Sequence, residues 1–289
     1  MKITVIGLGL IGGSMAVDLK RRHFADYVYG VESDVLHASV AKDMGLVDEI
    51  IPFEEGVAKA DLVILAIPVG AAVDTLGKVL DIFAAHSPDG AEKCRKVVID
   101  VCSTKENIVK SAGSHSFRKC FVASHPMAGT EYSGPWAAMS GLFDGRACIL
   151  CNSGDSGEEA VRTVEALYDT LNMRVIHMDA TTHDVHTAYV SHISHVTSFA
   201  LALTVLEKEK NEKHIFDLAS GGFSSTVRLA TSNADMWVPI FSQNKDNVLQ
   251  VIDTYLEKMR DFREAIAKDD KDGVRNLIES ANRIKRILR

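Results

Sequence analysis

The chain has 289 residues, of which 46% are hydrophobic and 25% charged, values close to those of average globular proteins. This composition excludes a disordered, fibrous or disulfide-scaffold protein and leaves room for one large domain or two ordinary ones. The net charge of −7 has the wrong sign for binding a phosphate backbone, so we expect no nucleic-acid partner.

The cysteines and the N-terminus indicate the cellular compartment. Five cysteines are too few and too scattered for a disulfide framework, which favours a reducing compartment. The chain enters an apolar strand after Lys2 without a cleavage-site pattern, and no apolar run approaches the ~18 residues of a membrane span. We therefore expect a cytoplasmic protein with no membrane partner.

Short runs rich in valine and isoleucine alternate with helix-like stretches in the first part of the chain. This alternation is typical of βαβ units and predicts an α/β fold with a Rossmann-type, doubly wound parallel sheet. The predicted strands are Ile3–Ile6, Tyr27–Val31, Leu62–Ile67, Val97–Val101, Phe121–Ala123, Ala147–Leu150 and Arg174–Ile176.

The pattern of apolar residues changes near Asp179, where strand-like runs end and apolar residues begin to recur at helical spacing. We place a boundary near His177–Thr182 and predict two domains, 1–178 and 179–289. The second domain should begin with a long helix, capped by a Thr or Asp and extending to about Lys208.

Two amphipathic stretches close the chain, at Val248–Ile266 and Val274–Leu288. Each carries charges opposite its apolar stripe. We interpret the stripes first as the core of the helical domain and second as a dimer surface.

The first predicted strand runs into the motif Gly7-Leu-Gly9-Leu10-Ile11-Gly12. The first glycine allows a tight turn, the second lets the backbone approach a pyrophosphate, and the third lets a helix pack on the strand. The N–H groups at the start of that helix would bind the anion. The motif therefore predicts a dinucleotide site, and a glycine turn without a nucleotide is the alternative.

An acidic residue, Glu32, ends the second predicted strand, 20 positions after Gly12. A carboxylate there accepts hydrogen bonds from the ribose hydroxyls and repels a 2′-phosphate. Ser33 and Asp34 follow it, whereas NADP needs cations at that place. The sequence thus favours NAD as the cofactor.

Two later segments follow strand ends, where a doubly wound sheet binds its ligands. One is Asp100-Val-Cys-Ser103-Thr-Lys105, and the other begins with His125-Pro. Histidine has a near-neutral pKa that suits it to take a proton from a hydroxyl while hydride leaves the same carbon. His125 is the candidate base, and a turn-forming His-Pro pair is the alternative.

A polar cluster lies on the predicted long helix. His192 and His195 are three residues apart and share a helix face, a spacing that zinc ligands also have. Because no cysteine or glutamate completes a ligand set, we expect no metal. The histidines either donate to a substrate anion or are structural. Arg228 follows the glycine pair Gly221-Gly222 and is either a surface charge or a carboxylate clamp. The full cluster comprises His183, Asp184, His186, Ser191, His192 and His195.

Together these motifs resemble the prephenate and arogenate dehydrogenases of tyrosine biosynthesis, almost from end to end. The resemblance rests on five blocks, of which the stretch from His125 to Gly134 is the most specific. The blocks are Gly7 to Ser14, Asp100 to Lys105, His125 to Gly134, His183-Asp184 with Ser191 to His195, and Gly221 to Arg228.

The resemblance implies an all-helical C-terminal dimerisation domain and a role for each of several residues. His125 looks like the catalytic histidine, and Ser103 like the serine that hydrogen-bonds the substrate hydroxyl. Arg228 looks like the arginine that binds a substrate carboxylate, while Glu131 and His195 look like residues of the substrate entrance. This sequence has Cys102 and Ser194 where family members often have glycine and proline.

The implied activity is the NAD-dependent oxidative decarboxylation of prephenate to 4-hydroxyphenylpyruvate by a homodimer. Arogenate, which would yield tyrosine, is the alternative substrate. A 3-hydroxyacid dehydrogenase or a pyrroline-carboxylate reductase shares the architecture, but the first of these usually carries a catalytic lysine where this helix has histidines. A non-catalytic NAD sensor is the alternative from another class, and it would not need Ser103, His125 and Arg228 together.

Overall fold

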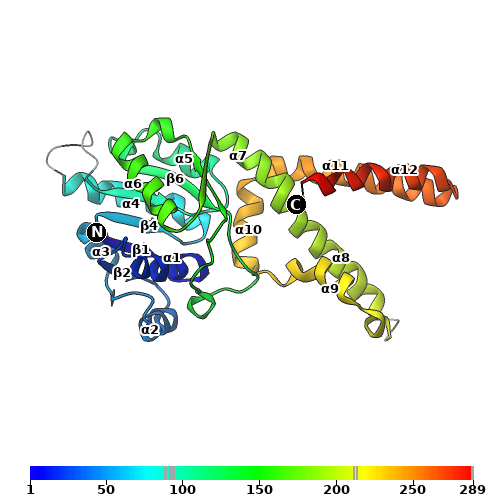
Figure 1. Ribbon diagram of the computed structural model, residues 1–289, viewed down its shortest axis with the longest axis horizontal. Helices are drawn as coiled ribbons and strands as arrows, with labels where there is room; N and C mark the ends of the chain where they lie inside the picture. Colours follow the sequence, from blue (N-terminus) through cyan, green and yellow to red (C-terminus); the bar gives the residue numbers. More distant parts are fainter. Residues whose placement is uncertain (88–89, 91–94, 211, 213, 288–289) are drawn as a thin grey trace. The chain divides into compact units, whose positions relative to one another are not determined.

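An eight-stranded sheet lies at the centre of the first part of the chain (Figure 1). This computed structural model describes residues 1–87, 90, 95–210, 212 and 214–287. The strands are β1 (Lys2–Ile6), β2 (Tyr27–Val31), β3 (Glu49–Ile50), β4 (Leu62–Leu65), β5 (Val97–Asp100), β6 (Phe121–Pro126), β7 (Ala147–Cys151) and β8 (Arg174–Met178).

The strand order is β3-β2-β1-β4-β5-β6-β7-β8, and the first six positions have the order typical of a Rossmann fold. Strands β1 to β6 are parallel, as predicted. The predicted doubly wound sheet is confirmed, with one difference in strand direction: β7 pairs antiparallel with β6, and β8 follows the direction of β7. The physical reason is the connection, because residues 127–146 contain only a three-residue 3₁₀ turn and no crossover helix.

Each predicted run contains a strand, with ends that differ by up to three residues. The sequence analysis missed β3, because a two-residue strand is too short to show an alternating pattern. All four residues of β4 and of β5 are buried, as expected for strands covered by helices on both faces.

Six helices accompany the sheet. They are α1 (Leu10–Arg21), α2 (Val35–Asp43), α3 (Phe53–Lys59), α4 (Val69–Ala85), α5 (Glu106–Ala112) and α6 (Glu158–Thr170).

The part that follows Asp179 is helical in its described residues, as predicted. Asp179 caps the long helix, and its side chain accepts the backbone N–H of Thr182. The helix consists of α7 (Ala180–Thr187), a π-helical turn η4 (Ala188–His192) and α8 (Ile193–Glu209), and it is followed by α9 (Gly221–Val227), the 3₁₀ turn η6 (Arg228–Thr231) and α10 (Ala234–Gln243).

The chain divides by its contacts into Met1–Asn244 and Lys245–Arg289. The second unit contains α11 (Lys245–Ala267) and α12 (Lys271–Ala281), which cover most of the two predicted amphipathic stretches. The last residue of the second stretch, Leu288, lies outside the described residues. A functional boundary at 178/179 stays a prediction.

The apolar stripes of the last helices are largely exposed within the single chain. The exposed fraction is 49% for Leu249, 51% for Met259 and 65% for Ile266. The interpretation of these stripes as a core of the helical domain is therefore wrong for these side chains. The sequence pattern could not decide this, because a core and a dimer surface need the same spacing.

The long helix Ala180–Glu209 passes a length and composition test for a membrane span, with a mean hydropathy of 1.3 over 18 residues. Serine, threonine and histidine interrupt this stretch, so it is not a continuous apolar run. One such helix is weak evidence, because core helices of soluble proteins pass the same test. This helix also carries the buried polar side chains of His183, Asp184 and His192.

Candidate active site

The turn between β1 and α1 requires glycine at two positions. Gly7 has a φ of +92°, and a Cβ added there would lie 2.5 Å from the carbonyl oxygen of Ala66. A Cβ on Gly12 would lie 2.0 Å from the carbonyl oxygen of Gly7, so the helix can approach the strand only without a side chain. These are the two steric demands that a dinucleotide-binding turn makes.

Gly9 differs from these two, because a Cβ there would meet no atom within 4 Å. It is the N-cap of α1, and no side chain caps the helix. The N–H groups of the first turn, which includes Leu10 and Ile11, therefore remain available to an anion. The open space and the free donors fit a pyrophosphate.

Glu32 follows β2 and is fixed by backbone donors. One carboxylate oxygen accepts the N–H of Leu8 at 3.0 Å, and the other accepts the N–H of Ser33 at 2.9 Å. The carboxylate is thus bonded to the glycine turn itself, at the place where the ribose of a bound dinucleotide is expected.

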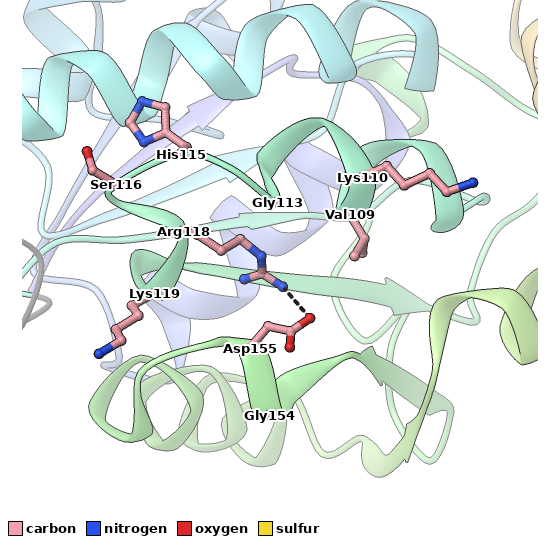
Figure 2. A pocket seen from close by; sticks show the side chains of 9 residues that line it. All are labelled: Val109, Lys110, Gly113, His115, Ser116, Arg118, Lys119, Gly154 and Asp155. Atoms are coloured by element: carbon pink, nitrogen blue, oxygen red, sulfur yellow. Dashed lines mark ion pairs between the residues drawn. The ribbon is translucent and has the colours of Figure 1, made fainter.

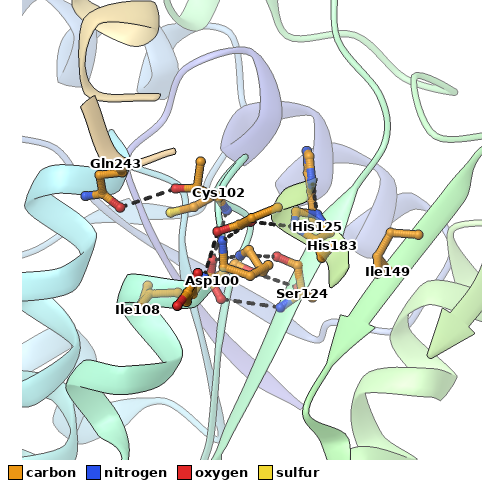
Figure 3. Close-up of polar contacts among 12 residues, drawn as sticks. Asp100, Cys102, Ile108, Ser124, His125, Ile149, His183 and Gln243 are labelled. Atoms are coloured by element: carbon orange, nitrogen blue, oxygen red, sulfur yellow. Dashed lines mark hydrogen bonds and ion pairs between the residues drawn. The ribbon is translucent and has the colours of Figure 1, made fainter. Parts of the chain in front are cut away.

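His125 lies near the carboxyl end of β6, on the sheet edge that also carries the glycine turn and the loop after β5. Its Nδ1 is 2.8 Å from Nε2 of His183 (Figure 3). Burial lowers the pKa of His125 well below 6.5, and the neighbouring His183, Lys105 and His192 lower it further. The ring is therefore neutral near pH 7 and able to accept a proton.

Asp184 connects α7 to the loop that carries Ser103. Its two carboxylate oxygens accept the backbone N–H of Lys105 at 2.8 Å and that of Glu106 at 3.0 Å, at the start of α5. One of these oxygens also contacts Nδ1 of His183 at 2.8 Å. The histidine pair and the loop after β5 are thus tied to one carboxylate.

The π-helical turn η4 explains why two histidines nine residues apart are both linked to Asp184. Nine residues of α-helix rotate a side chain by roughly half a turn, which would place His183 and His192 on opposite sides. The wider turn shifts this register. His192 then contacts Asn244 at 3.2 Å, and Asn244 donates to the carbonyl oxygen of Asp184 at 2.7 Å. Burial lowers the pKa of His192 to about 4, so this ring is also neutral.

A fully buried ion pair lies beside the histidines. Nζ of Lys105 contacts the carboxylate of Asp100 and donates to the carbonyl oxygen of Ser124 at 2.7 Å, and both charged side chains have no exposed surface. Burial by itself would lower the pKa of Lys105, but the neighbouring groups, Asp100 foremost, together more than offset this and the pKa is raised. A permanent cation therefore lies close to His125.

The predicted substrate residues fall into two contacts. Arg228 donates to the carboxylate of Glu131 at 2.9 Å, and the arginine side chain is 53% exposed. His195 stacks on Trp237, with ring centroids 3.6 Å apart. Burial lowers the pKa of His195, the hydrogen bond to the carbonyl oxygen of Ser191 opposes this, and the charge of Arg228 adds to the lowering.

Ser103 lies in the loop after β5, where the neighbouring Thr104 donates to Gln243 of α10 at 3.2 Å. The loop after His125 lines a cavity of about 350 Å³ together with Arg146. A separate cavity of about 870 Å³ lies between the end of α5 and the segment around Asp155 (Figure 2). None of the predicted site residues lines this second cavity.

Two sequence profiles cover most of the chain. The nucleotide-binding domain of prephenate dehydrogenase matches residues 15–177, and the dimerization domain of prephenate dehydrogenase matches residues 179–280. The chain belongs to the prephenate dehydrogenase family. The family and the oxidoreductase class expected from the sequence motifs are therefore confirmed.

Named relatives agree with the profiles. A prephenate dehydrogenase of Bacillus subtilis is 31% identical over 285 residues, which cover 97% of this chain and 75% of that protein. A cyclohexadienyl dehydrogenase of Zymomonas mobilis is 31% identical over 276 residues, covering 93% and 90%. The structure of prephenate dehydrogenase from Aquifex aeolicus, in complex with hydroxyphenyl propionate and NAD⁺, is 27% identical with a TM-score of 0.85 and covers 99% of this chain and 97% of that chain.

Sequence reasoning missed several side chains that complete the site. The partners Trp237, Gln243 and Asn244 come from α10 and its end, and no motif singled them out. The sequence offered one signal for them, a tryptophan and two amide side chains between residues 237 and 244, shortly after Arg228. Among the described residues, no three histidine, cysteine or carboxylate side chains are grouped as metal ligands.

Proposed function

We propose that this chain is an NAD-dependent prephenate dehydrogenase that forms 4-hydroxyphenylpyruvate in tyrosine biosynthesis. The observation that carries the proposal is the neutral, partly buried His125 on the same sheet edge as the glycine turn. In support, the glycine turn has open space and free N–H donors for a pyrophosphate, and the Glu32 carboxylate beside it would bind a ribose. NAD is the cofactor, because these residues fit it and the family relative from Aquifex aeolicus was solved with NAD⁺.

The reaction needs few groups from the protein. Prephenate is a cyclohexadiene with a ring carboxylate, a pyruvyl carboxylate and a 4-hydroxyl. NAD, when bound, accepts the hydride from C4. His125 accepts the hydroxyl proton, and Ser103 hydrogen-bonds the same hydroxyl and orients it. The electron pair of the O–H bond then forms the C4 carbonyl. Loss of the ring carboxylate as CO₂ moves the electron pair of its C–C bond through the ring to the carbonyl oxygen. This oxygen takes the proton back from His125, which leaves the aromatic phenol and a neutral histidine.

An assay with two substrates tests this proposal. NAD reduction is followed with prephenate and with arogenate, which differ by a keto or an amino group on the side chain. We expect kcat/KM to be higher with prephenate. A preference for arogenate would replace the substrate but keep the chemistry, whereas no turnover of either would overturn the proposed function.

NAD should be preferred over NADP. The carboxylate of Glu32, with Asp34 beside it, would lie against a 2′-phosphate, and like charges in contact cost several kcal/mol. We expect kcat/KM with NAD to exceed that with NADP by roughly 10²-fold or more. The matched variant Glu32→Gln keeps the shape but removes the charge, and it should narrow this ratio. Equal use of both cofactors by the wild type would contradict the prediction.

Arg228 should bind a substrate carboxylate. Arg228→Ala is expected chiefly to raise KM, by an amount equal to a charge-assisted hydrogen bond of roughly 1.5–3 kcal/mol, or about 10- to 150-fold. Arg228→Lys should recover part of this, because an ammonium cannot make a paired contact. Steady-state kinetics of both variants measure the effect. A loss confined to kcat would assign Arg228 to the chemical step instead.

We also propose a homodimer formed through the helical half. Apolar side chains of the long helix and of α11 are exposed in the single chain, with exposed fractions of 66% for Leu203 and 51% for Met259, and a second protomer would bury them. The profile that matches this part of the chain is that of a dimerization domain. Sedimentation should give a particle near twice the chain mass of 31.5 kDa. A monomer at micromolar concentration would contradict this.

A cytoplasmic location and the domain boundary at 178/179 belong to the same proposal. Four cysteines are buried free thiols, as expected in a reducing compartment, while Cys94 lies outside the described residues. The two matching profiles end and begin at residues 177 and 179, which supports the boundary.

A further inference from the structure

Behind His125 lies a linear chain of three side chains that ends on a buried carboxylate. Nδ1 of His125 is 2.8 Å from Nε2 of His183, and Nδ1 of His183 is 2.8 Å from Oδ1 of Asp184. We propose that His183 and Asp184 are positioning residues that fix the proton of His125 on Nδ1 and so leave Nε2 free to accept the substrate proton. This inference rests on the proposed function, in which His125 is the general base.

The direction of each hydrogen bond follows from the carboxylate. Oδ1 of Asp184 already accepts the backbone N–H of Lys105, and Oδ2 accepts that of Glu106, so both oxygens act as acceptors. An ionised carboxylate has no proton to donate. Nδ1 of His183 must therefore carry the proton in this bond.

The second step concerns the ring of His183. A neutral imidazole has one donor and one acceptor nitrogen. Burial lowers the pKa of His183, and Lys105 opposes its protonation, while Asp184 and Asp100 act in the opposite direction without restoring the ordinary pKa. With its proton on Nδ1, neutral His183 presents the lone pair of Nε2. His125 can then only donate, from its Nδ1.

The charges around His125 support the same arrangement. Lys105, His183 and His192 all disfavour a protonated ring, and burial does so more strongly. Through its hydrogen bond to His183, Asp184 is the carboxylate linked to His125, and we expect this link to stabilise the imidazolium once Nε2 has accepted the substrate proton. The proton moves from the hydroxyl oxygen to Nε2, and Nδ1–H of His125 stays in place.

The decisive variant is His183→Phe, which fills the site with a ring that cannot accept a hydrogen bond. Without its acceptor, Nδ1 of His125 is no longer held in the protonated form, and a fraction of the rings carries the proton on Nε2. We expect kcat to fall by roughly 10- to 10³-fold, within the contribution of a general base, with KM nearly unchanged. His183→Gln should recover part of kcat, because its amide oxygen can accept from Nδ1.

The matched control is His186→Phe, the same substitution at an exposed position of α7. It should leave kcat and KM unchanged. Circular dichroism and sedimentation of each variant show whether the fold and the assembly survive. If His183→Phe does not fold, the tautomer of His125 in the wild-type enzyme, measured by NMR, carries the test.

¹⁵N NMR of the histidine rings tests the proposal without substrate. In the free wild-type enzyme, His125 should be protonated on Nδ1 only, and in His183→Phe it should be a mixture of tautomers. A proton on Nε2 of His125 in the wild type, or an unchanged tautomer and kcat in His183→Phe, would overturn the inference. If the expected tautomer is found in an enzyme that does not oxidise prephenate, the proposed function fails and the positioning role stands.

Discussion

Replacement of His125 by asparagine is expected to lower kcat by roughly 10²–10⁴ and to leave KM nearly unchanged. Asparagine keeps much of the volume of the histidine side chain, and its amide can donate to Nε2 of His183. The neighbouring side chains should therefore stay in place. It cannot take up the hydroxyl proton, and the chemical step fails while binding survives. Steady-state kinetics with prephenate and NAD measure both constants.

The pH profile provides an independent measurement of the same residue. The protonated ring cannot act as a base, so kcat/KM should fall as the pH decreases through the pKa of His125. Because burial and the neighbouring His183, Lys105 and His192 lower that pKa well below 6.5, the acidic limb should lie below the ordinary histidine range. The sequence alone placed it within that range. A His125→Asn enzyme that keeps its rate and its acidic limb would return His125 to the role of a turn residue.

Much of the sheet was visible in the sequence, because buried parallel strands are short runs of β-branched residues between helices. Whether a strand runs parallel or antiparallel to its neighbour was not visible in the sequence. Ala147–Cys151 is as rich in apolar residues as a parallel strand, and only the missing crossover helix before it distinguishes an antiparallel one. Likewise, the exposure of Leu249 and Ile266 depends on what covers them, which helical spacing does not encode.

The candidate site shows the same division between local and long-range information. The positive φ of Gly7 and the close approach of Gly12 to Gly7 arise within a few residues, so the spacing of the glycines predicts them. The contact of His125 with His183 joins residues 58 positions apart, and its geometry depends on a π-helical turn that no local pattern announced. Sequence reasoning therefore found the individual histidines but could not connect them.

Removal of the buried cation at Lys105 should have the largest effect on stability. The side chains of Lys105 and Asp100 are both fully buried, and loss of one partner leaves an uncompensated charge. Backbone donors at Cys102 and Ser124 still contact Asp100, at 3.0 and 3.3 Å, but they do not neutralise it. We expect Lys105→Met to lower the free energy of unfolding by about 3–5 kcal/mol, measured by denaturant titration at one fixed protein concentration.

The matched control lies on the adjacent helix α5, where Lys110 pairs with Glu106 at 2.7 Å and is 69% exposed. Lys110→Met should cost at most about 0.5 kcal/mol, because water screens a surface pair of this kind. The double variant Asp100→Asn with Lys105→Met should recover part of the loss, since it leaves no buried charge behind. Equal effects of Lys105→Met and Lys110→Met would show that the burial of the Lys105–Asp100 pair does not determine its contribution. In Lys105→Met the acidic limb of kcat/KM should also move to higher pH, because one cation that lowers the pKa of His125 is gone.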